Sequence, residues 1–418
     1  MTSSVKFSEI AELVMGQSPK GADCNETGDG FPLLNGPTEF TERSPLPVQF
    51  TTAGKKFSKT GDILFCVRGS TTGRMNYADQ AYAIGRGIGA IRGINGYPTA
   101  YIRAVLEHNL DRLLVAATGS TFPNVGKDLL NNFEVNVCSP EQAQQANKLL
   151  VGIEDKRYLN SQTNQTLEEM AQAIFKSWFV DFDPVKAKIN GDKPEGMDEA
   201  TASLFPEKLV ESELGLIPDG WEVTKLSKVI DLLNGFAFKS SDYVKEGTFV
   251  LRTKNFDSSN SVERLGDDVY LPDEFLESHK KYLCEAYDYH VVMVAASIGK
   301  TAMIYPHQLP ALRNQNMWCF RPKDESLRFY TKYMVDGLVK LNMGLASGSA
   351  RAFFKKGDFN SYEFALPSSE LLTKFNDVVG NLVRQKGSLL NQNVQLAAMR
   401  DTLLPKLLSG EIELVEQS

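Results

Sequence analysis

Cysteine and histidine are scarce in this chain of 418 residues, and they are scattered along it. The cysteines form no Cys-x-x-Cys pair, and the histidines do not fall at metal-ligand spacing. A zinc site needs closely spaced thiols and imidazoles, and a disulfide-stapled fold needs a dense set of cysteines. The sequence therefore predicts neither. The scattered residues are Cys24, Cys66, Cys138, Cys284, Cys319, His108, His279, His290 and His307.

Long apolar runs are also absent. No stretch approaches the roughly 20 apolar residues that a helix needs to cross a bilayer. The first residues, MTSSVKFSEIAELV, lack the basic region and apolar stretch of a signal peptide. The composition, 42% hydrophobic and 23% charged, is that of a globular protein, and the length favours two or three domains. We therefore expect a cytoplasmic protein with no membrane partner.

Motifs of catalysis and cofactor binding are missing as well. The chain has no Gly-x-Ser-x-Gly elbow, no His-Glu-x-x-His helix and no Asn/Asp-Pro-Pro-aromatic segment of an amino-methyltransferase. Gly85, Gly87 and Gly89 do not make Gly-x-Gly-x-x-Gly, and no βαβ pattern surrounds them. The sequence predicts no catalytic residue, no cofactor and no metal.

What the sequence does contain is an internal repeat. At an offset of 229 residues, NNFEVNVCSPEQ falls on NSYEFALPSSEL, and the match continues through the segments that follow. Near the start of each half the offset is smaller, because the loops differ in length: FSEIAELVMG (7–16) falls on LSKVIDLLNG (226–235). The chain is a tandem duplication whose copies have diverged most in their loops.

Each copy follows the same α+β plan. A mixed, strand-rich region of short apolar runs punctuated by turns is followed by one long helix. We expect strand-rich regions at 1–138 and 215–367, a long helix at 139–190, an acidic linker at 191–214, and a second long helix with a C-terminal tail at 368–418. Ser139-Pro140-Glu141-Gln142 is a helix-start signal for the first of these helices.

Both predicted helices carry apolar residues at alternating spacings of four and three, a pattern typical of a coiled coil. At about 1.5 Å per residue each helix would reach about 60 Å, which suits a spacer. The alternative is two unrelated amphipathic helices that lie on their own domains. The predicted contact positions are Leu149, Ile153, Lys156, Asn160, Thr163, Leu167, Met170 and Ile174, and then Val378, Leu382, Gln385, Leu389, Gln392, Leu396, Met399 and Leu403.

The net charge of −7 argues against a nucleic-acid partner, but its distribution weakens that argument. Residues 191–222 carry nine acidic and two basic groups, which accounts for the whole excess. The strand-rich regions are close to neutral, so their basic residues are able to gather on one face.

The segment VVMVAASIGKTAMI (291–304) contains Gly-Lys-Thr, the end of a nucleotide-binding P-loop. Val294 occupies the position of the first glycine of that motif. When the two copies are aligned, Lys300 corresponds to Arg74, and the first copy has no Lys-Thr at this place. The copies share a strand, a small-residue turn, a glycine and a basic residue. The sequence therefore excludes an ATP site and leaves a DNA-contacting loop or an ordinary turn.

Basic, amide and hydroxyl side chains in such loops can contact phosphates or base edges. The candidates are Arg68, Ser70, Thr71, Arg74, Arg86 and Lys127 in the first copy, and Arg252, Lys254, Asn255, Ser297, Lys300, Arg313, Asn314, Asn316, Arg351, Lys355 and Lys356 in the second.

Three stretches resemble the specificity subunits of type I restriction–modification systems. They are SELGLIPDGWEVTKLSKVIDLLNGFAFKSSDY (212–243), IFKSWFVDFDPVKAK (174–188) and LLPKLLSGEIEL (403–414). The order of variable region, helix, variable region and helix resembles that family too. The resemblance covers essentially the full chain and is weak only in the variable regions.

The resemblance implies that each strand-rich region is a target-recognition domain that reads one half of a split, asymmetric site in double-stranded DNA. It further implies two domains related by a pseudo-twofold, with antiparallel helices that set the spacing and dock two methyltransferase subunits. Translocase–nuclease subunits join the full complex, and the specificity subunit itself has no catalytic site. Two rival hypotheses remain: a fused methyltransferase or nuclease, and a coiled-coil scaffold that binds only protein.

Apolar residues at the helix ends are candidate docking points for the methyltransferase subunits, with local packing as the alternative. They are Phe175, Trp178, Phe179, Leu404, Leu407 and Leu408.

Overall fold

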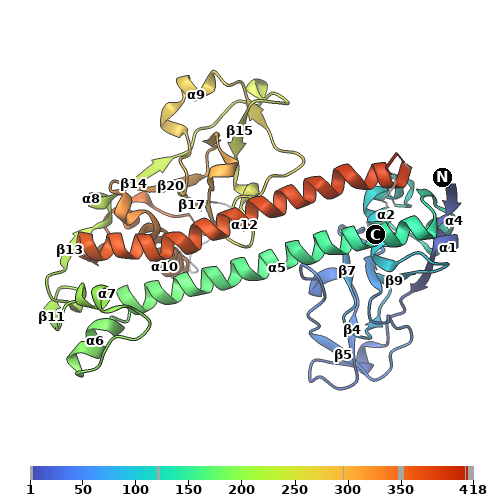
Figure 1. The fold of residues 1–418 in the computed structure, drawn as a ribbon, viewed down its shortest axis with the longest axis horizontal. Helices are drawn as coiled ribbons and strands as arrows, with labels where there is room; N and C mark the ends of the chain where they lie inside the picture. Colours follow the sequence, from blue (N-terminus) through green and yellow to red (C-terminus); the bar gives the residue numbers. More distant parts are fainter. Residues whose placement is uncertain (1–2, 120–122, 295, 347–352, 410, 413–418) are drawn as a thin grey trace, which may run out of the picture. The chain divides into compact units, whose positions relative to one another are not determined.

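The computed structural model describes residues 3–119, 123–294, 296–346, 353–409 and 411–412. It divides into two compact units (Figure 1): unit 1 is Met1–Ser161 with Gln392–Ser418, and unit 2 is Gln162–Asn391. Each unit therefore contains one strand-rich region together with part of each long helix. The domains predicted from the sequence ended at the helix boundaries instead.

A four-stranded antiparallel sheet in the order β2–β9–β6–β7 forms the centre of unit 1. Both faces of this sheet are covered, so its central strand β6 is apolar throughout. Ile63 and Phe65 point into a cluster with helix α2, and Leu64 points into a cluster on the opposite face. The strands are β2 (Ala11–Met15), β6 (Ile63–Cys66), β7 (Met75–Tyr77) and β9 (Ile88–Gly93).

The remaining elements of unit 1 surround that sheet. A mixed sheet has the order β3–β5–β4–β8, with β4 and β8 parallel, and β1 pairs with β10. These strands are β1 (Ser3–Lys6), β3 (Cys24–Asn25), β4 (Phe31–Leu34), β5 (Gln49–Thr51), β8 (Ala83–Ile84) and β10 (Glu134–Val137). The helices are α1 (Phe7–Ile10), α2 (Thr99–His108), α3 (Leu110–Ala116) and α4 (Lys127–Asn132).

Unit 2 has sheets in the orders β14–β20–β17–β18 and β16–β15–β19, and a pair β13–β21. The strands are β13 (Glu222–Lys225), β14 (Ile230–Asn234), β15 (Thr248–Leu251), β16 (Tyr270–Leu271), β17 (Tyr289–Val292), β18 (Thr301–Met303), β19 (Ala311–Arg313), β20 (Met317–Pro322) and β21 (Glu363–Leu366). The helices packed around them are α8 (Leu226–Val229), α9 (Phe275–Ser278), α10 (Arg328–Ala346) and α11 (Lys356–Asn360).

The two units share one topology, which confirms the tandem duplication. In each, the first strand of the central sheet pairs with the last, and a hairpin completes the sheet. Each unit also has a parallel pair, β4–β8 or β15–β19, in the second sheet. One buried ion pair is repeated as well: Arg92 pairs with Asp62 in unit 1, and Arg321 pairs with Asp288 in unit 2.

The long helices are α5 (Pro140–Phe179) and α12 (Ser369–Ser409). Helix α5 begins at the predicted Ser-Pro signal and ends earlier than predicted, since Phe182 adopts a left-handed φ of 56° before the short helix α6 (Asp183–Ile189). The linker then contains α7 (Glu199–Ser203) and the hairpin β11 (Leu209–Ser212) and β12 (Gly215–Pro218).

The buried residues of α5 follow the predicted helical spacing, but five of the eight predicted contact positions are not buried. In most of these cases the next residue along the chain is buried instead. Met170 and Lys156 are exposed, whereas Ala171 is buried. The same shift occurs on α12, where Met399 is exposed and Leu404 is buried. The buried positions of α5 are Ala143, Ala146, Leu150, Ile153, Asn160, Asn164, Leu167, Ala171 and Trp178.

Candidate nucleic-acid interface

Three loop segments of unit 1 meet at the end of the β6–β7 hairpin. Val67 N–H donates to Gly87 O at 2.9 Å, and Val125 N–H donates to Val67 O at 2.8 Å. The Thr72 hydroxyl donates to Pro123 O at 2.9 Å. These bonds join the segments into one surface, which we name platform 1. Its segments are residues 67–74, 85–87 and 123–127.

Platform 1 brings together all six candidates predicted in the first copy. Arg68, Arg74, Arg86 and Lys127 come from all three segments and are exposed. None of these four forms an ion pair with another described residue, and the guanidinium of Arg74 reaches only Pro37 O at 3.5 Å. Ser70 is exposed and Thr71 is half-buried in the same hairpin loop. The platform therefore offers four unneutralised cations beside hydroxyl groups.

Unit 2 builds the same surface from the corresponding segments. Met293 N–H donates to Asn316 O at 3.1 Å, and Phe354 N–H donates to Met293 O at 3.0 Å. We name this surface platform 2. It comprises residues 293–294, 296–300, 314–316 and 353–356. The repeated hydrogen bonds show that the two platforms have a common backbone frame.

Platform 2 carries a different set of side chains. Lys300, Asn316 and Lys355 are exposed, and Ser297 and Asn314 are half-buried.

Lys356 donates to Leu232 O at 2.7 Å, so its ammonium is held against the protein. Arg351 lies outside the described residues. Phe353, which the sequence analysis did not single out, is 54% exposed at the position that Asn124 holds on platform 1. Comparing the two copies position by position could have found it.

Arg252, Lys254 and Asn255 follow strand β15 and are largely engaged within unit 2. The Arg252 guanidinium donates to Asp267 O at 2.7 Å, and Lys254 Nζ lies 2.5 Å from Asp267 Oδ2. Asn255 is buried, and its side chain donates to Glu263 O and to Asp268. The prediction that Asn255 contacts DNA is therefore wrong, because this amide supports a turn.

The prediction for Arg313 is also wrong. This residue is 1% exposed, and its guanidinium donates to the backbone carbonyls of Asn234, Leu283 and Lys281. Because its guanidinium N–H groups donate to buried backbone carbonyls, Arg313 holds loops together inside unit 2 and cannot reach a ligand at the surface.

Five of the six predicted docking residues are buried in the cores of their own units, and Phe175 is half-buried. Trp178 and Phe179 pack against Phe375 of α12, and Phe175 packs against Tyr330 of α10. Leu404, Leu407 and Leu408 are at most 4% exposed in the core of unit 1. The alternative, local packing, accounts for the five buried residues, and the docking prediction is wrong for them; for the half-buried Phe175 it stays a prediction.

The Gly-Lys-Thr segment lies in a hairpin between two antiparallel strands. A P-loop instead joins a strand to a helix whose N-terminus faces the phosphates. Gly299 has a φ of 81°, and Gly73 at the same place in unit 1 has a φ of 97°. The glycine is needed for this left-handed turn, which agrees with the exclusion of an ATP site.

Among the described residues, Asp288, His290 and Cys319 form a buried group whose potential ligand atoms lie within 4.8 Å of one another. His290 and Cys319 are partners in the β17–β20 register, which is why sequence spacing gave no sign of the group. Asp288, however, accepts two hydrogen bonds from Arg321, at 2.9 and 2.6 Å.

The chemistry of this group disfavours a metal ion. Burial raises the pKa of the Cys319 thiol well above its usual value, and Arg321 already supplies the positive charge that Asp288 needs. In unit 1 the same Asp–Arg pair stands beside Leu64 and Ala90, so the pair has a structural role without ligands around it. We assign no metal to this group.

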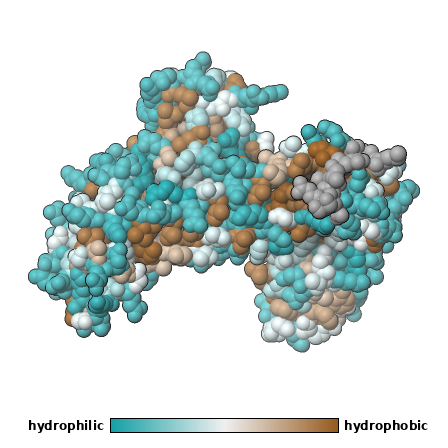
Figure 2. All heavy atoms as spheres, viewed as in Figure 1, coloured by the Kyte–Doolittle hydropathy of each residue, from teal (hydrophilic) through white to brown (hydrophobic). Residues whose placement is uncertain are grey.

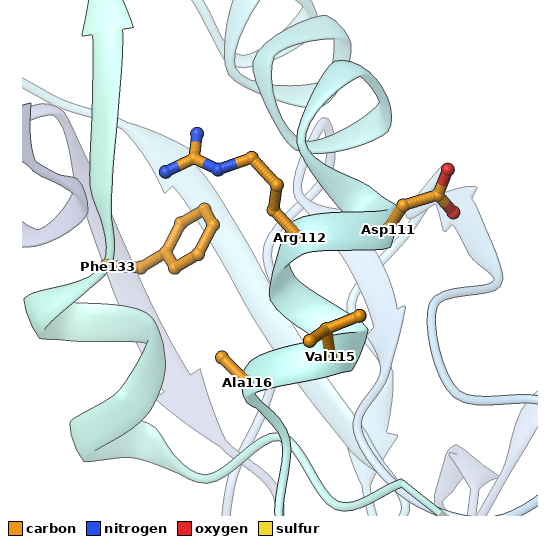
Figure 3. Close-up of a pocket in the computed structure, with 5 residues that line it drawn as sticks. All are labelled: Asp111, Arg112, Val115, Ala116 and Phe133. Atoms are coloured by element: carbon orange, nitrogen blue, oxygen red, sulfur yellow. The ribbon is translucent and has the colours of Figure 1, made fainter.

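Away from the platforms, unit 1 has a shallow, open hollow of about 470 Å³ lined by Val115, Ala116 and Phe133, with Arg112 stacked over the Phe133 ring (Figure 3).

In the described part of the chain no helix is both long and apolar enough to cross a membrane. Figure 2 shows hydrophobic residues interspersed along α5 and α12 on a largely hydrophilic surface.

Comparisons with known proteins agree with this duplicated architecture. A family model, the Type I restriction modification DNA specificity domain, matches residues 3–169 and 218–375. The HindI specificity subunit of Haemophilus influenzae is 28% identical over 90% of each chain. The MjaIX specificity subunit of Methanocaldococcus jannaschii is 24% identical over 71% of this chain and 65% of its own.

Among solved structures, the type I restriction–modification S subunit from M. genitalium has a similar fold, with a TM-score of 0.50 and 14% identity. The likeness covers 100% of this chain and 97% of that one. The family match spans both copies of the repeat and most of the chain. This chain therefore belongs to the family of type I restriction–modification specificity subunits, and it contains two specificity domains.

Proposed function

We propose that this chain gives a type I restriction–modification complex its DNA sequence specificity, with each platform reading one half of a bipartite, asymmetric site. The observation that carries this proposal is one backbone frame with two sets of exposed side chains. Arg68 and Arg86 of platform 1 are replaced by Val294 and Gln315 on platform 2. Different side chains on one frame would read different half-sites, since base edges are distinguished by their donors and acceptors.

The charges of the platforms support this role. Exposed arginine and lysine serve phosphates as well as guanine edges, and seryl and threonyl hydroxyls serve either. In the proposed complex α5 and α12 act as an antiparallel spacer that sets the distance between half-sites. The chain itself has no catalytic role. Two methyltransferase subunits bring the methyl-transfer chemistry, and translocase–nuclease subunits join the full complex.

Coexpression of this chain with its methyltransferase partner, followed by mapping of modified adenines across a host genome, tests the proposal. We expect one split motif with a fixed spacer, modified on both strands. An assembled complex supplied with S-adenosylmethionine that modifies no motif would overturn it. Binding of protein partners without salt-dependent binding to duplex DNA would favour the scaffold instead.

Neutralising one exposed cation on each platform should weaken DNA binding without unfolding the protein. We expect Arg74→Gln and Lys300→Gln each to lower affinity roughly tenfold and to reduce the salt dependence of binding by about one ion. Titration of the assembled complex with duplex DNA at several salt concentrations measures both effects. Lys193→Gln, which removes an exposed cation paired with Glu199 in the linker, is the matched control and should change neither.

The exposed positions Met170 and Met399 are better docking candidates than the buried aromatic residues. They correspond to each other in the repeat, and their side chains are 48% and 49% exposed on α5 and α12. Two identical partners would bind two equivalent surfaces. We therefore expect Met170→Glu and Met399→Glu each to remove one methyltransferase subunit, because a carboxylate is costly in an apolar interface.

Native mass spectrometry of the coexpressed complex counts the bound subunits. The control is Val115→Glu, which places the same charge on an 88% exposed apolar residue in the hollow of unit 1. An unchanged two-partner complex with both methionine variants would contradict the docking prediction.

A further inference from the structure

Unit 2 contains a buried group of charges where its recognition domain meets both long helices. Glu168 of α5 accepts from Lys332 Nζ of α10 at 2.6 Å and from Lys386 Nζ of α12 at 3.1 Å. Lys332 and Lys386 are 1% and 3% exposed. Asp336 lies 3.3 Å from Lys332 and also accepts from the Tyr289 hydroxyl. Two bases, two acids and a tyrosine make a neutral group, which we name joint 2.

Unit 1 has a group of the same composition at the corresponding place, which we name joint 1. Arg103 of α2 pairs with Glu107 at 2.9 Å, and Arg400 of α12 pairs with Glu107 at 3.4 Å. The Tyr77 hydroxyl donates to Glu154 of α5 at 3.0 Å, and Arg103 lies over the Tyr77 ring.

The joints are not simple copies of each other. Arg103 and Glu107 correspond to Lys332 and Asp336 in the repeat, but the residues on the long helices do not correspond. The tyrosine has moved from one strand to the other: Tyr77 is the register partner of Ile63, and Tyr289 is the register partner of Met303. Two different residue sets thus make the same neutral group, always with a glutamate on α5 and a base on α12.

We propose that the two joints are positioning devices that fix the angle of each recognition domain on the helix pair, and so set the spacer length that the complex accepts. The inference rests on the proposed bipartite reading. Each added base pair moves a half-site by about 3.4 Å and turns it by about 34°, so a domain must be held firmly to reject the wrong spacer. Apolar packing permits sliding, whereas a buried ion pair keeps its geometry because a displaced charge is left without a partner.

The test uses the assembled complex and a pool of DNAs that carry both half-sites of its mapped motif at different spacer lengths. We expect the unaltered complex to prefer one length by roughly tenfold or more over its neighbours. In Glu168→Gln, joint 2 keeps its shape but loses the central charge, and we expect this preference to fall to about twofold to threefold. Glu169→Gln is the matched control, since among the described residues that exposed neighbour bonds only to Gln165, and the change should leave the preference unchanged.

A purely structural role would lower modification equally at all spacer lengths, and that result would overturn the proposal. If Glu168→Gln does not fold, the double variant Glu168→Gln with Lys386→Met serves instead. It keeps the Lys332–Asp336 pair and a neutral core while it removes the ion pairs that Glu168 forms with Lys332 and with Lys386. If these variants modify the normal motif with an unaltered spacer preference, the positioning role of the joints is rejected and the proposed function stands. Absence of any motif in the unaltered complex would reject the proposed function itself.

Discussion

Replacing Arg313 by methionine is expected to destabilise unit 2 by about 2–4 kcal/mol, because each buried acceptor left without a donor costs about 1–3 kcal/mol. The guanidinium is the donor to the carbonyls of Asn234 and Lys281, and Arg321 also serves Leu283 O at 3.0 Å. Methionine fills much of the same volume, so the loss isolates the hydrogen bonds from a simple cavity.

Tryptophan fluorescence during urea unfolding measures this effect in unit 2 alone, since Trp178, Trp221 and Trp318 all lie there. Lys300→Met in the same unit is the control: we expect unchanged unfolding and weaker DNA binding. The reverse result for Arg313→Met, with stability retained and DNA binding lost, would restore this arginine to the DNA-contacting set.

Unit 2 is expected to lose stability as the pH falls from about 6.5 to about 4. Burial lowers the pKa of His290 to about 4, and the neighbouring Asp288 opposes this shift only in part. An unfolded histidine titrates near 6.5, so between these values the unfolded chain binds a proton that the folded chain does not. The stabilisation is complete above about pH 6.5, and its loss below pH 4 amounts to on the order of 3 kcal/mol.

Replacement of His290 by leucine, the residue at the corresponding Leu64 of unit 1, should remove most of this pH dependence. A smaller slope should remain, because burial also lowers the pKa of His307 in the same unit. Urea midpoints from tryptophan fluorescence at several pH values between 4 and 7.5 give the slope directly. His279→Leu, at a half-buried position of the same unit, should leave the slope in place. An undiminished slope in His290→Leu would assign the acid sensitivity to another group.

Both predictions concern groups that the sequence could not identify. Arg313 was predicted to contact DNA by the same reasoning as Asn314 and Asn316, and nothing in the sequence around it marks it as buried. What separates it is its place in strand β19, an outer strand of the β16–β15–β19 sheet whose three residues are all buried, where its guanidinium meets three backbone carbonyls. His290 and Cys319 likewise meet only because β17 and β20 pair in one particular register.

The sequence by itself determined the duplication, the start of α5 at Pro140, the strand-turn-strand character of the Gly-Lys-Thr segment and the resemblance to specificity subunits. These features depend on neighbouring residues: a capping serine before a proline, a glycine where φ is positive, and apolar residues at alternating spacings of three and four.

The tertiary structure decided which side of each helix is buried and which charges meet. Glu168 and Glu169 are adjacent and chemically identical, yet one is held by Lys332 and Lys386 and the other faces outward. Helical spacing fixes which residues share a face, but a face shifted by one residue has the same spacing of threes and fours. The choice is made by partners far away in the chain, because burying a charge is favourable only where an opposite charge is already in place.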